Sequence, residues 1–340
     1  GDLFLLDVPS GKITQLTNTV ERESGAVFSG DEKKIIYTFD QNLYAWEIST
    51  GNVTQITDFR KGKKSSPAPT NDQEKWLKQD QLAYMQVIKE RYERQNTIRN
   101  IQKAEQPNRP KEIYIDDKSV DQPRLTPDGN FVVFRLSKRA AAKSTIVPNY
   151  VTASGFTEDI QARTKVGAPL GTSELFVYDI KRDTVLQVKT DSLPGIADTP
   201  AFTNVYPKKD KKESKDKKPQ LRSVSFSNPV WSHNGTYAVL QLRAADNKDR
   251  WIALLDVATQ KLTVIDRQHD DAWVGGPGGF SIGWISDTRL WFVSEETGYA
   301  HLYTYDVASK TKKTLTSGKF EVQQAELNRS KKHFYIITNE

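Results

Sequence analysis

The chain has 340 residues, of which 36% are hydrophobic and 27% charged; it can bury a large apolar core, and this excludes a disordered protein. Its formal net charge is +6, but the lysine-rich segment 208–218 contributes four of these charges with seven Lys and three acidic residues. The rest is nearly neutral, so no nucleic-acid partner is expected. The absence of Cys excludes disulfides and a Cys nucleophile, and no apolar run approaches the ~20 residues of a membrane span.

One sequence pattern recurs five times along the chain. It consists of a short apolar or aromatic run that ends at an acidic residue, a polar turn, and a second run that ends at Thr, Lys or Asp. Two such runs around a polar turn are typical of a β-hairpin. The five copies are LFLLDVPSGKITQLT (3–17), LYAWEISTGNVTQIT (43–57), LFVYDIKRDTVLQVK (175–189), IALLDVATQKLTVID (252–266) and LYTYDVASKTKKTLT (302–316).

A second pattern alternates with the first, and in it a turn rich in Ser, Asp, Asn and Gly precedes alternating β-branched and aromatic residues. Its copies lie at 28–39, 125–136, 231–242, 284–295 and 327–338. This pattern also predicts a hairpin. Two hairpins form a four-stranded unit, and such units at a spacing of ~45 residues predict a β-propeller. The fold class is therefore all-β, with about five blades' worth of sequence; a twisted pair of β-sandwiches is the alternative.

Three insertions interrupt the repeats, at about 60–111, 138–171 and 203–224. The first is predicted to form a helix over 72–103, with Asp72 as N-cap and Pro107 and Pro110 after its end. This helix either packs on the rim or mouth of the propeller or forms a lid or docking surface. The second insertion, with Gly and Pro at its ends, is predicted to be a long ordered loop. The third is predicted to be a solvated, Lys-rich loop. An apolar stripe on the helix comprises Leu77, Tyr84, Val87, Ile88 and Tyr92.

The first and last hairpins are each half of a blade, since 3–17 follows the first pattern and 322–340 contains the second. The two halves either complete one blade and close a five-bladed ring, or belong to a longer propeller. We expect the longer propeller.

No catalytic residue is predicted within these residues. The sequence GFSIG (279–283) matches the nucleophile elbow of α/β-hydrolases, with Asp306 and His333 following in the required order. That elbow must precede a helix, but a turn and the strand-like LWFVSE follow here, so Ser281 is assigned to a propeller strand. The spacing of the four His predicts no metal site, no cofactor is expected, and GGPGG (275–279) indicates a flexible or close-approach loop.

Several phrases resemble one family. They are LTPDGNFVVF (125–134), LFVYD (175–179), AWVGG (272–276) and FVSEETGYAHLYTYDVASKTKKTLTSGKFEV (292–322). Together they resemble the N-terminal β-propeller domain of dipeptidyl peptidase IV-like serine peptidases, of the prolyl oligopeptidase family. Through the repeats, the resemblance extends over essentially the whole chain.

The resemblance implies an eight-bladed propeller that gates and binds peptide substrates for a C-terminal α/β-hydrolase domain. That domain carries the Ser, Asp and His of the family and is absent from these 340 residues, so this portion is expected to bind peptides without cleaving them. The resemblance also implies a periplasmic or secreted location and a homodimer of the parent protein. The alternative function is a stand-alone propeller that acts as a protein-binding scaffold.

Residues of the candidate site follow from the same resemblance. In the family, the segment that resembles AWVGG lines the substrate pocket, which implies substrate-binding roles for Trp273, Gly275 and Gly276. Dipeptidase members also place adjacent glutamates on a helical segment between blades, where they hold the free amine of the substrate. The helix predicted here has only isolated glutamates, so release of dipeptides is not predicted. Glu295 and Glu296, in the SEETG phrase, are the only adjacent glutamates in the sequence. They are the remaining candidate substrate-binding residues.

Overall fold

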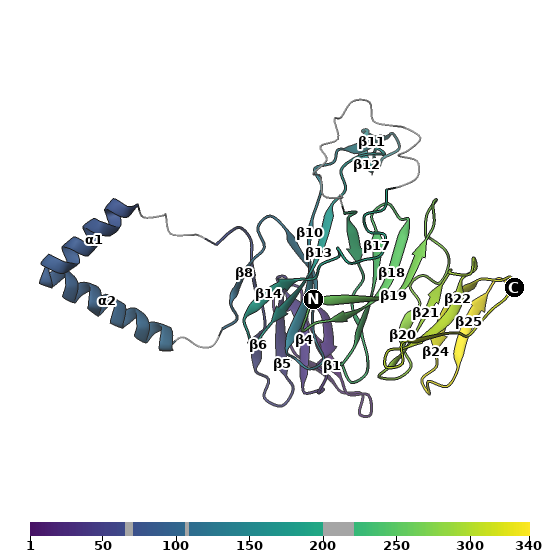
Figure 1. Cartoon of the computed structure of the whole chain (residues 1–340), viewed down its shortest axis with the longest axis horizontal. Coiled ribbons are helices and arrows are strands. Elements are labelled where there is room, and N and C mark those ends of the chain that lie inside the picture. Colours follow the sequence, from purple (N-terminus) through teal and green to yellow (C-terminus); the bar gives the residue numbers. More distant parts are fainter. Residues whose placement is uncertain (65–70, 106–108, 200–220) are drawn as a thin grey trace.

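The computed structural model describes residues 1–64, 71–105, 109–199 and 221–340, and antiparallel β-sheets make up most of it (Figure 1). The blade sheets follow one another in chain order, and the yellow C-terminal sheets lie at one end of the row. The predicted all-β class with a helical insertion is therefore confirmed. Among the described residues, neither helix is both long and apolar enough to cross a bilayer.

Four of the sheets have four or more strands, and each combines hairpins of the two sequence patterns. The first contains β3 (Ser24–Phe28), β4 (Lys34–Phe39), β5 (Asn42–Glu47) and β6 (Val53–Gln55). The second contains β9 (Ser119–Leu125), β10 (Phe131–Lys138), β13 (Thr172–Asp179) and β14 (Thr184–Gln187). The third contains β15 (Val224–Phe226), β16 (Val230–Trp231), β17 (Ala238–Ala244), β18 (Asp249–Asp256) and β19 (Lys261–His269). The fourth contains β20 (Ile282–Trp284), β21 (Arg289–Ser294), β22 (His301–Asp306) and β23 (Thr311–Thr314).

Each of these sheets buries one face against the next sheet in the chain. Between the first two sheets, Ile36 and Leu43 pack in one cluster with Val132 and Phe134. Equivalent clusters join the second sheet to the third, the third to the fourth, and the fourth to a C-terminal hairpin. A single four-stranded sheet cannot bury both of its faces, so this repeated packing is what stabilises the blades.

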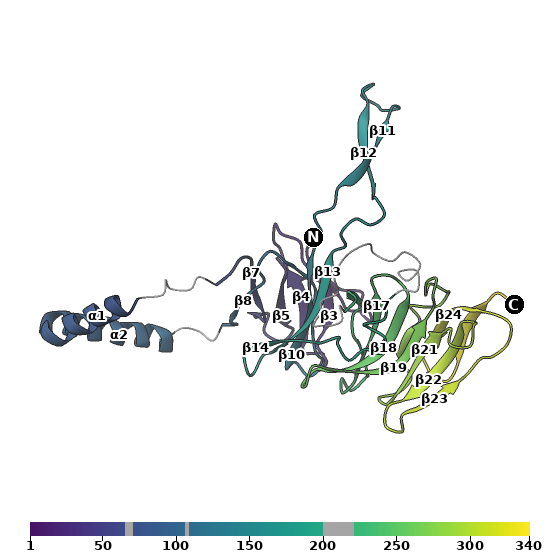
Figure 2. The same ribbon diagram turned by 45° about the horizontal axis from the view of Figure 1, so that its top comes forward.

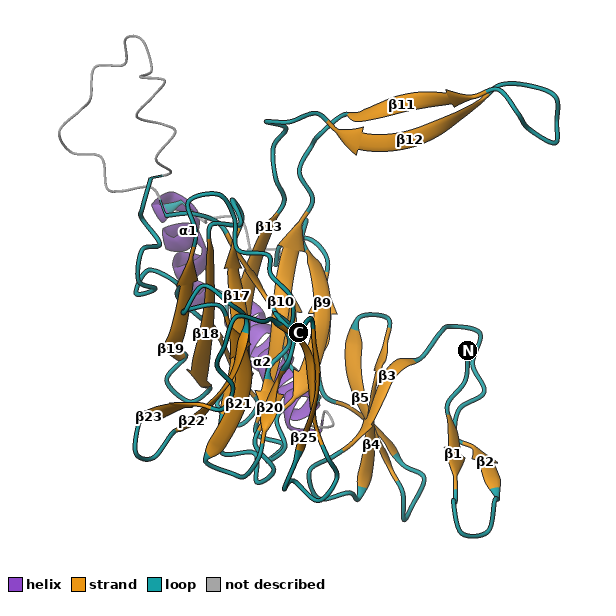
Figure 3. Ribbon diagram, turned by 90° about the vertical axis from the view of Figure 1, so that its right-hand side faces the viewer, coloured by secondary structure: helices purple, strands orange, loops and turns teal. Residues whose placement is uncertain are grey.

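The two terminal hairpins form separate two-stranded sheets. One consists of β1 (Phe4–Leu6) and β2 (Ile13–Gln15), the other of β24 (Val322–Leu327) and β25 (Phe334–Thr338). They do not pair with each other in the described structure, and Figures 1 and 3 show the N- and C-terminal ends apart. The pairing that would close a five-bladed ring is thus not formed.

The first insertion contains two helices, where the sequence predicted one. They are α1 (Asp72–Tyr84) and α2 (Gln86–Glu105), and Met85 between them has an extended backbone that ends α1. The N-cap is Asn71, not Asp72: the Asn71 side chain accepts a hydrogen bond of 2.7 Å from the backbone N–H of Glu74. The helix pair stands away from the sheets in Figures 1 and 2, and its apolar stripe is exposed, so it does not pack on the rim.

The base of this insertion is held by a short parallel pair, β7 (Asp58–Arg60) and β8 (Glu112–Tyr114), and by a bridge between Gly62 and Asp116. The second insertion was predicted to be a loop, and this is wrong. It contains a hairpin of β11 (Ser144–Asn149) and β12 (Glu158–Thr164), which projects from the body in Figures 2 and 3. The strand signal is weak because every residue of β12 is exposed, and no buried face imposes an alternating pattern. Most of the Lys-rich third insertion lies outside the described residues.

Candidate substrate-binding site

The β17–β18 hairpin places two arginines side by side. Arg243 near the end of β17 and Arg250 near the start of β18 are direct partners in the antiparallel ladder. Directly opposite residues point to the same face of a sheet with their Cβ atoms about 5 Å apart, and like charges in this arrangement are destabilising. A pair of arginines at this position therefore requires a compensating interaction.

Arg250 is the more buried of the two, with 9% of its surface exposed. Its Nη2 donates a 2.6 Å hydrogen bond to the backbone carbonyl of Val293, whereas its buried Nε has no hydrogen-bond partner among the described residues. Burial lowers the pKa of the guanidinium, against the attraction of Asp266 and Glu295, and the neighbouring charge of Arg243 lowers it further. The site therefore holds a cation whose hydrogen-bonding capacity is not satisfied by the described chain.

Arg243 connects the hairpin to the segment that the sequence singled out. Its Nη2 donates to the carbonyl of Val274, and its buried Nε has no partner in the described part of the chain. Asn247, in the turn of the hairpin, has a left-handed backbone (φ 59°) and accepts a 2.7 Å hydrogen bond from the N–H of Val274. The turn and Arg243 together fix the position of the 272–276 segment.

Glycines in this segment leave room for the charged side chains. A Cβ added at Gly276 would lie 1.1 Å from Oε1 of Glu295, and one added at Gly279 would lie 2.7 Å from Nη1 of Arg250. A side chain at either position would have to displace a charged group. The close approach of backbone to side chains predicted for GGPGG is therefore present at these two glycines.

A pocket of about 310 Å³ opens beside these groups. Its walls combine donors with apolar surface, and the ring of Phe280 lies at its edge with 91% of the residue exposed. Trp273, next to the pocket-lining Val274, is 72% exposed. Exposed aromatic rings beside a concave site are typical of a surface that binds a ligand. The residues that line the pocket are Ser225, Phe226, Ser227, Gln241, Leu242, Arg243, Arg250, Val274, Gly275, Gly276, Gly279 and Phe280.

The structure brings together four of the five site residues suggested by the sequence. Trp273, Gly275 and Gly276 belong to the pocket segment, and the half-buried Glu295 contacts Gly276. Burial, followed by repulsion from Glu321, raises the pKa of Glu295, while Arg250 acts against this shift.

Glu296 is held elsewhere, in an ion pair with Lys312, which also lies 3.0 Å from Asp266. The two residues follow the end of β21, and Glu296 lies in a turn in which the N–H of Gly298 donates to the carbonyl of Glu295. The chain changes direction there, so the adjacent glutamates do not share a site.

Sequence reasoning missed Arg243, Arg250 and Phe280. The two arginines lie in the sequence LQLRAADNKDRWIALL (240–255), in which a polar turn separates two strand-like runs. Arg243 and Arg250 are equally far from the centre of that turn. Such spacing predicts opposite positions only once the length of the turn is known.

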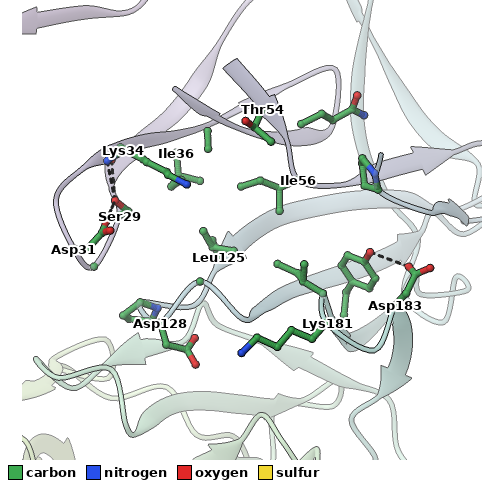
Figure 4. A pocket seen from close by; sticks show the side chains of 18 of the residues that line it. Ser29, Asp31, Lys34, Ile36, Thr54, Ile56, Leu125, Asp128, Lys181 and Asp183 are labelled. Carbon is green, nitrogen blue, oxygen red and sulfur yellow. Dashed lines mark hydrogen bonds between the residues drawn. The ribbon is translucent and has the colours of Figure 1, made fainter. Parts of the chain in front are cut away.

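A larger cleft of about 1010 Å³ lies between the first two blades (Figure 4). Ile36, Ile56 and Leu125 form part of its apolar wall, and charged residues of both signs surround them, including Asp31, Lys34, Asp128 and Lys181.

On one side of this cleft the hydroxyl of Tyr178 donates a 3.0 Å hydrogen bond to Asp183. Burial together with this bond raises the pKa of Tyr178 to about 12. The charged side chains of this cleft are spread along its walls, whereas Arg243 and Arg250 are direct neighbours in the sheet.

The remaining motifs do not form a catalytic or metal site. Ser281 directly precedes β20 and is followed by a strand, not by the helix that a nucleophile elbow needs. In the described ranges of the chain, no group of three or more His, Asp or Glu is arranged to hold a metal ion.

The profile of the family described as the dipeptidyl peptidase IV (DPP IV) N-terminal region matches residues 1–83 and 124–340. The chain belongs to this family. The matched residues include the strands of the four large sheets, except residues 119–123 of β9, and the whole 272–296 region. The unmatched residues 84–123 include all of α2, so the isolated glutamates of that helix have no counterpart in the family profile.

One solved structure of a DPP IV-like protein shares the fold. The crystal structure of Porphyromonas gingivalis dipeptidyl peptidase 4 aligns with a TM-score of 0.55 at 14% sequence identity, over 95% of this chain and 37% of that one. A putative dipeptidyl aminopeptidase IV from Bacteroides ovatus aligns with a TM-score of 0.49 at 11% identity, over 96% of this chain and 38% of that one. The chain thus spans less than two fifths of these DPP IV-like structures. No curated protein matches the chain.

Proposed function

We propose that this chain is the substrate-gating and substrate-binding propeller portion of a DPP IV-like serine peptidase that acts on oligopeptides. Membership of the DPP IV N-terminal region family supports the assignment to such a peptidase. The observation that carries the binding role is the pocket in which Arg250 faces a glycine-rich segment. Arg250 is nine-tenths buried, and its Nε has no hydrogen-bond partner among the residues that the structure describes. In this proposal a hydrolase domain outside these residues performs the cleavage, and the parent protein is periplasmic or secreted and a homodimer.

The pocket offers the three kinds of contact that a peptide can use. Guanidinium groups donate hydrogen bonds to carbonyl or carboxylate oxygens. The rings of Trp273 and Phe280 offer flat apolar surface to peptide side chains. Gly275 and Gly276 allow a peptide backbone to approach closely, because they have no side chain.

Binding of short peptides to the 340-residue chain tests the proposal, with isothermal titration calorimetry as the measurement. Replacement of Trp273 by Ala is expected to weaken peptide binding, since the ring is exposed and its loss leaves the core intact. The matched control is Trp76→Ala on α1, which removes another exposed ring (61%, against 72% for Trp273) far from the pocket. Equal peptide affinities in the two variants and the unmodified chain would contradict the proposed site.

The alternative function, a stand-alone scaffold closed into a ring, would have β1–β2 and β24–β25 form one blade. These hairpins are separate sheets in the described structure, and this favours the peptidase propeller.

A further inference from the structure

We propose that the pocket between Arg243 and Arg250 binds a carboxylate group of the peptide, and that it selects peptides that present one. This inference rests on the proposed peptide-binding function and goes beyond it by naming the chemical group that the pocket recognises. The inter-blade cleft and the exposed helix pair are weaker candidates, because nothing on their surfaces points to one kind of ligand.

The register of the β17–β18 hairpin favours an anionic ligand. Arg243 and Arg250 are ladder partners, so two cations share one face of the sheet at close range. Each uses one Nη atom for a single backbone carbonyl, of Val274 and Val293 respectively. A backbone carbonyl carries no net charge, so these bonds hold the guanidinium groups in place without neutralising them. An anion between them would remove the repulsion.

The nearby carboxylates of Asp266 and Asp270 already accept hydrogen bonds from other groups. Asp266 accepts hydrogen bonds from Gln268 (2.9 Å) and Ser294 (3.0 Å) and pairs with Lys312 (3.0 Å). Asp270 accepts from the backbone N–H groups of the segment itself, at residues 272 and 273.

Glu295 is a further carboxylate beside the arginines, and both Arg250 and Arg243 act against the rise of its pKa. These three side chains carry a net charge of +1 when Glu295 is ionised and +2 when it is protonated.

Two buried guanidinium donors are available to a ligand. Nε of Arg243 and Nε of Arg250 are buried without partners in the described residues, and an unsatisfied buried donor of a charged group is destabilising. A guanidinium binds a carboxylate best through two parallel N–H groups, a geometry that a planar carboxylate satisfies and a neutral amide does not. Apolar walls from Phe226, Leu242 and Phe280 limit competing water and strengthen the ionic contact.

The pocket is also of the right size for one side chain. Its volume of about 310 Å³ corresponds to roughly ten water molecules at ~30 Å³ each, enough for an acidic side chain with part of its backbone. The carboxylate could belong to an Asp or Glu side chain or to the C-terminus of a short peptide, and the experiment separates these sources.

The test measures binding of three tetrapeptides to the full 340-residue chain by calorimetry at pH 7. One is Ala-Ala-Glu-Ala with an amidated C-terminus, the second has Gln in place of Glu, and the third has Gln and a free C-terminal carboxylate. We expect the Glu peptide, the free-carboxylate peptide, or both to bind about tenfold tighter than the amidated Gln peptide, the ratio expected for a charge-assisted hydrogen bond. The peptide that gains affinity identifies the source of the carboxylate.

Two variants locate the effect. Arg250→Met and Arg243→Met should each abolish the preference, whereas Lys181→Met, which removes a positive charge from the inter-blade cleft, should preserve it. Circular dichroism shows whether Arg250→Met folds. If it does not, Arg243→Met provides the test, because Arg243 is only partly buried.

The outcomes separate the two proposals. Equal affinities for all three peptides, with binding still sensitive to Trp273→Ala, would overturn carboxylate selection and leave the peptide-binding function standing. No binding of any peptide at millimolar concentration would overturn both. A carboxylate preference that survives both arginine variants would also overturn this inference, because the preference would then arise elsewhere.

Discussion

The carboxylate of Glu295 occupies the space in which a side chain at Gly276 would begin, 1.1 Å from the position of its Cβ. Because this carboxylate is the end of a flexible side chain, Gly276→Ala should displace it while leaving the fold intact. At Gly278, by contrast, φ is +70° and a Cβ would meet the backbone carbonyl of Val322 at 2.7 Å. We expect Gly278→Ala to destabilise the chain by about 1–2 kcal/mol or more from the left-handed conformation alone, and Gly276→Ala by less. Thermal unfolding of the two variants checks this, and equal losses would contradict it.

Glu295 should make carboxylate binding dependent on pH. Its pKa is raised, mainly by burial and then by Glu321 and Asp270, with Arg250 and Arg243 opposing. As pH falls through this raised pKa, Glu295 loses its negative charge while most peptide carboxylates remain ionised, so affinity for the Glu peptide should rise. In Glu295→Gln the affinity should be higher at pH 7 and nearly constant down to about pH 5. Calorimetric titrations at several pH values measure this, and the opposite slope in the unmodified chain would refute it.

Asp249 should stabilise the third sheet. It is fully buried and accepts hydrogen bonds from Arg222 (2.5 Å) and Arg267 (2.8 Å). Asp249→Asn would remove the buried carboxylate that Arg222 and Arg267 share and leave each with one more exposed partner, Asp246 and Asp198 respectively. Removal of one partner from a buried ion pair costs about 3–5 kcal/mol. The more exposed Asp246→Asn, which also loses a bond to Arg222, is the matched control and should cost less. Urea unfolding of both variants gives the comparison, and a smaller loss at Asp249 would show that the buried pair is not the stabilising element.

Asp249 should also make the stability of the folded chain depend on pH. Burial alone would raise the pKa of Asp249, but hydrogen bonds from Arg267 and Arg222 outweigh it and hold the pKa below the ordinary value. A lowered pKa contributes stability that is present above the unfolded value, near 3.9, and is lost as pH falls through the folded value. Unfolding measured at acidic pH should therefore show a smaller loss for Asp249→Asn than for the unmodified chain. Parallel losses would contradict the lowered pKa.

Removal of the helix pair should not affect the sheets. The apolar residues of α1 and α2 are exposed, and the base of the insertion is closed by β7, β8 and the Gly62–Asp116 bridge. Replacement of residues 72–105 by a short Gly-Ser linker is expected to leave the main thermal transition within a few degrees. A large decrease in the melting temperature would show that the helices do pack on the blades in solution.

The parts of the fold that could be predicted are those that depend on local pattern. Most strand pairs of the large sheets are marked by a polar turn between apolar runs, so hairpins such as β4–β5 follow from short stretches of sequence. The hairpin β11–β12 was missed, because its residues are exposed on both faces and no buried side selects an alternating pattern. The N-cap was placed one residue late, because Asn71 and Asp72 are both good capping residues and only the backbone distinguishes them.

The site was only partly predictable for a different reason. The segment at 272–276 could be found from its resemblance to a family. The two arginines beside it, Arg243 and Arg250, belong to the β17–β18 hairpin, which the resemblance did not single out. The burial of Arg250, and the lack of a partner for its Nε within the described part of the chain, depend on the packing of Gly279 and Val293 around it. Contacts between segments that are far apart in the sequence cannot be predicted from the spacing of residues.

The turn between β17 and β18 gives the pocket a constraint that substitution experiments would not reveal. Arg243 and Arg250 face each other only because the turn has its present number of residues, and the carbonyl of Asn247 in that turn also holds Val274. A gain or loss of one residue would move one arginine to the opposite face of the sheet. In related proteins that have both arginines, we therefore expect this turn to have the same length, while the identity of its other residues varies.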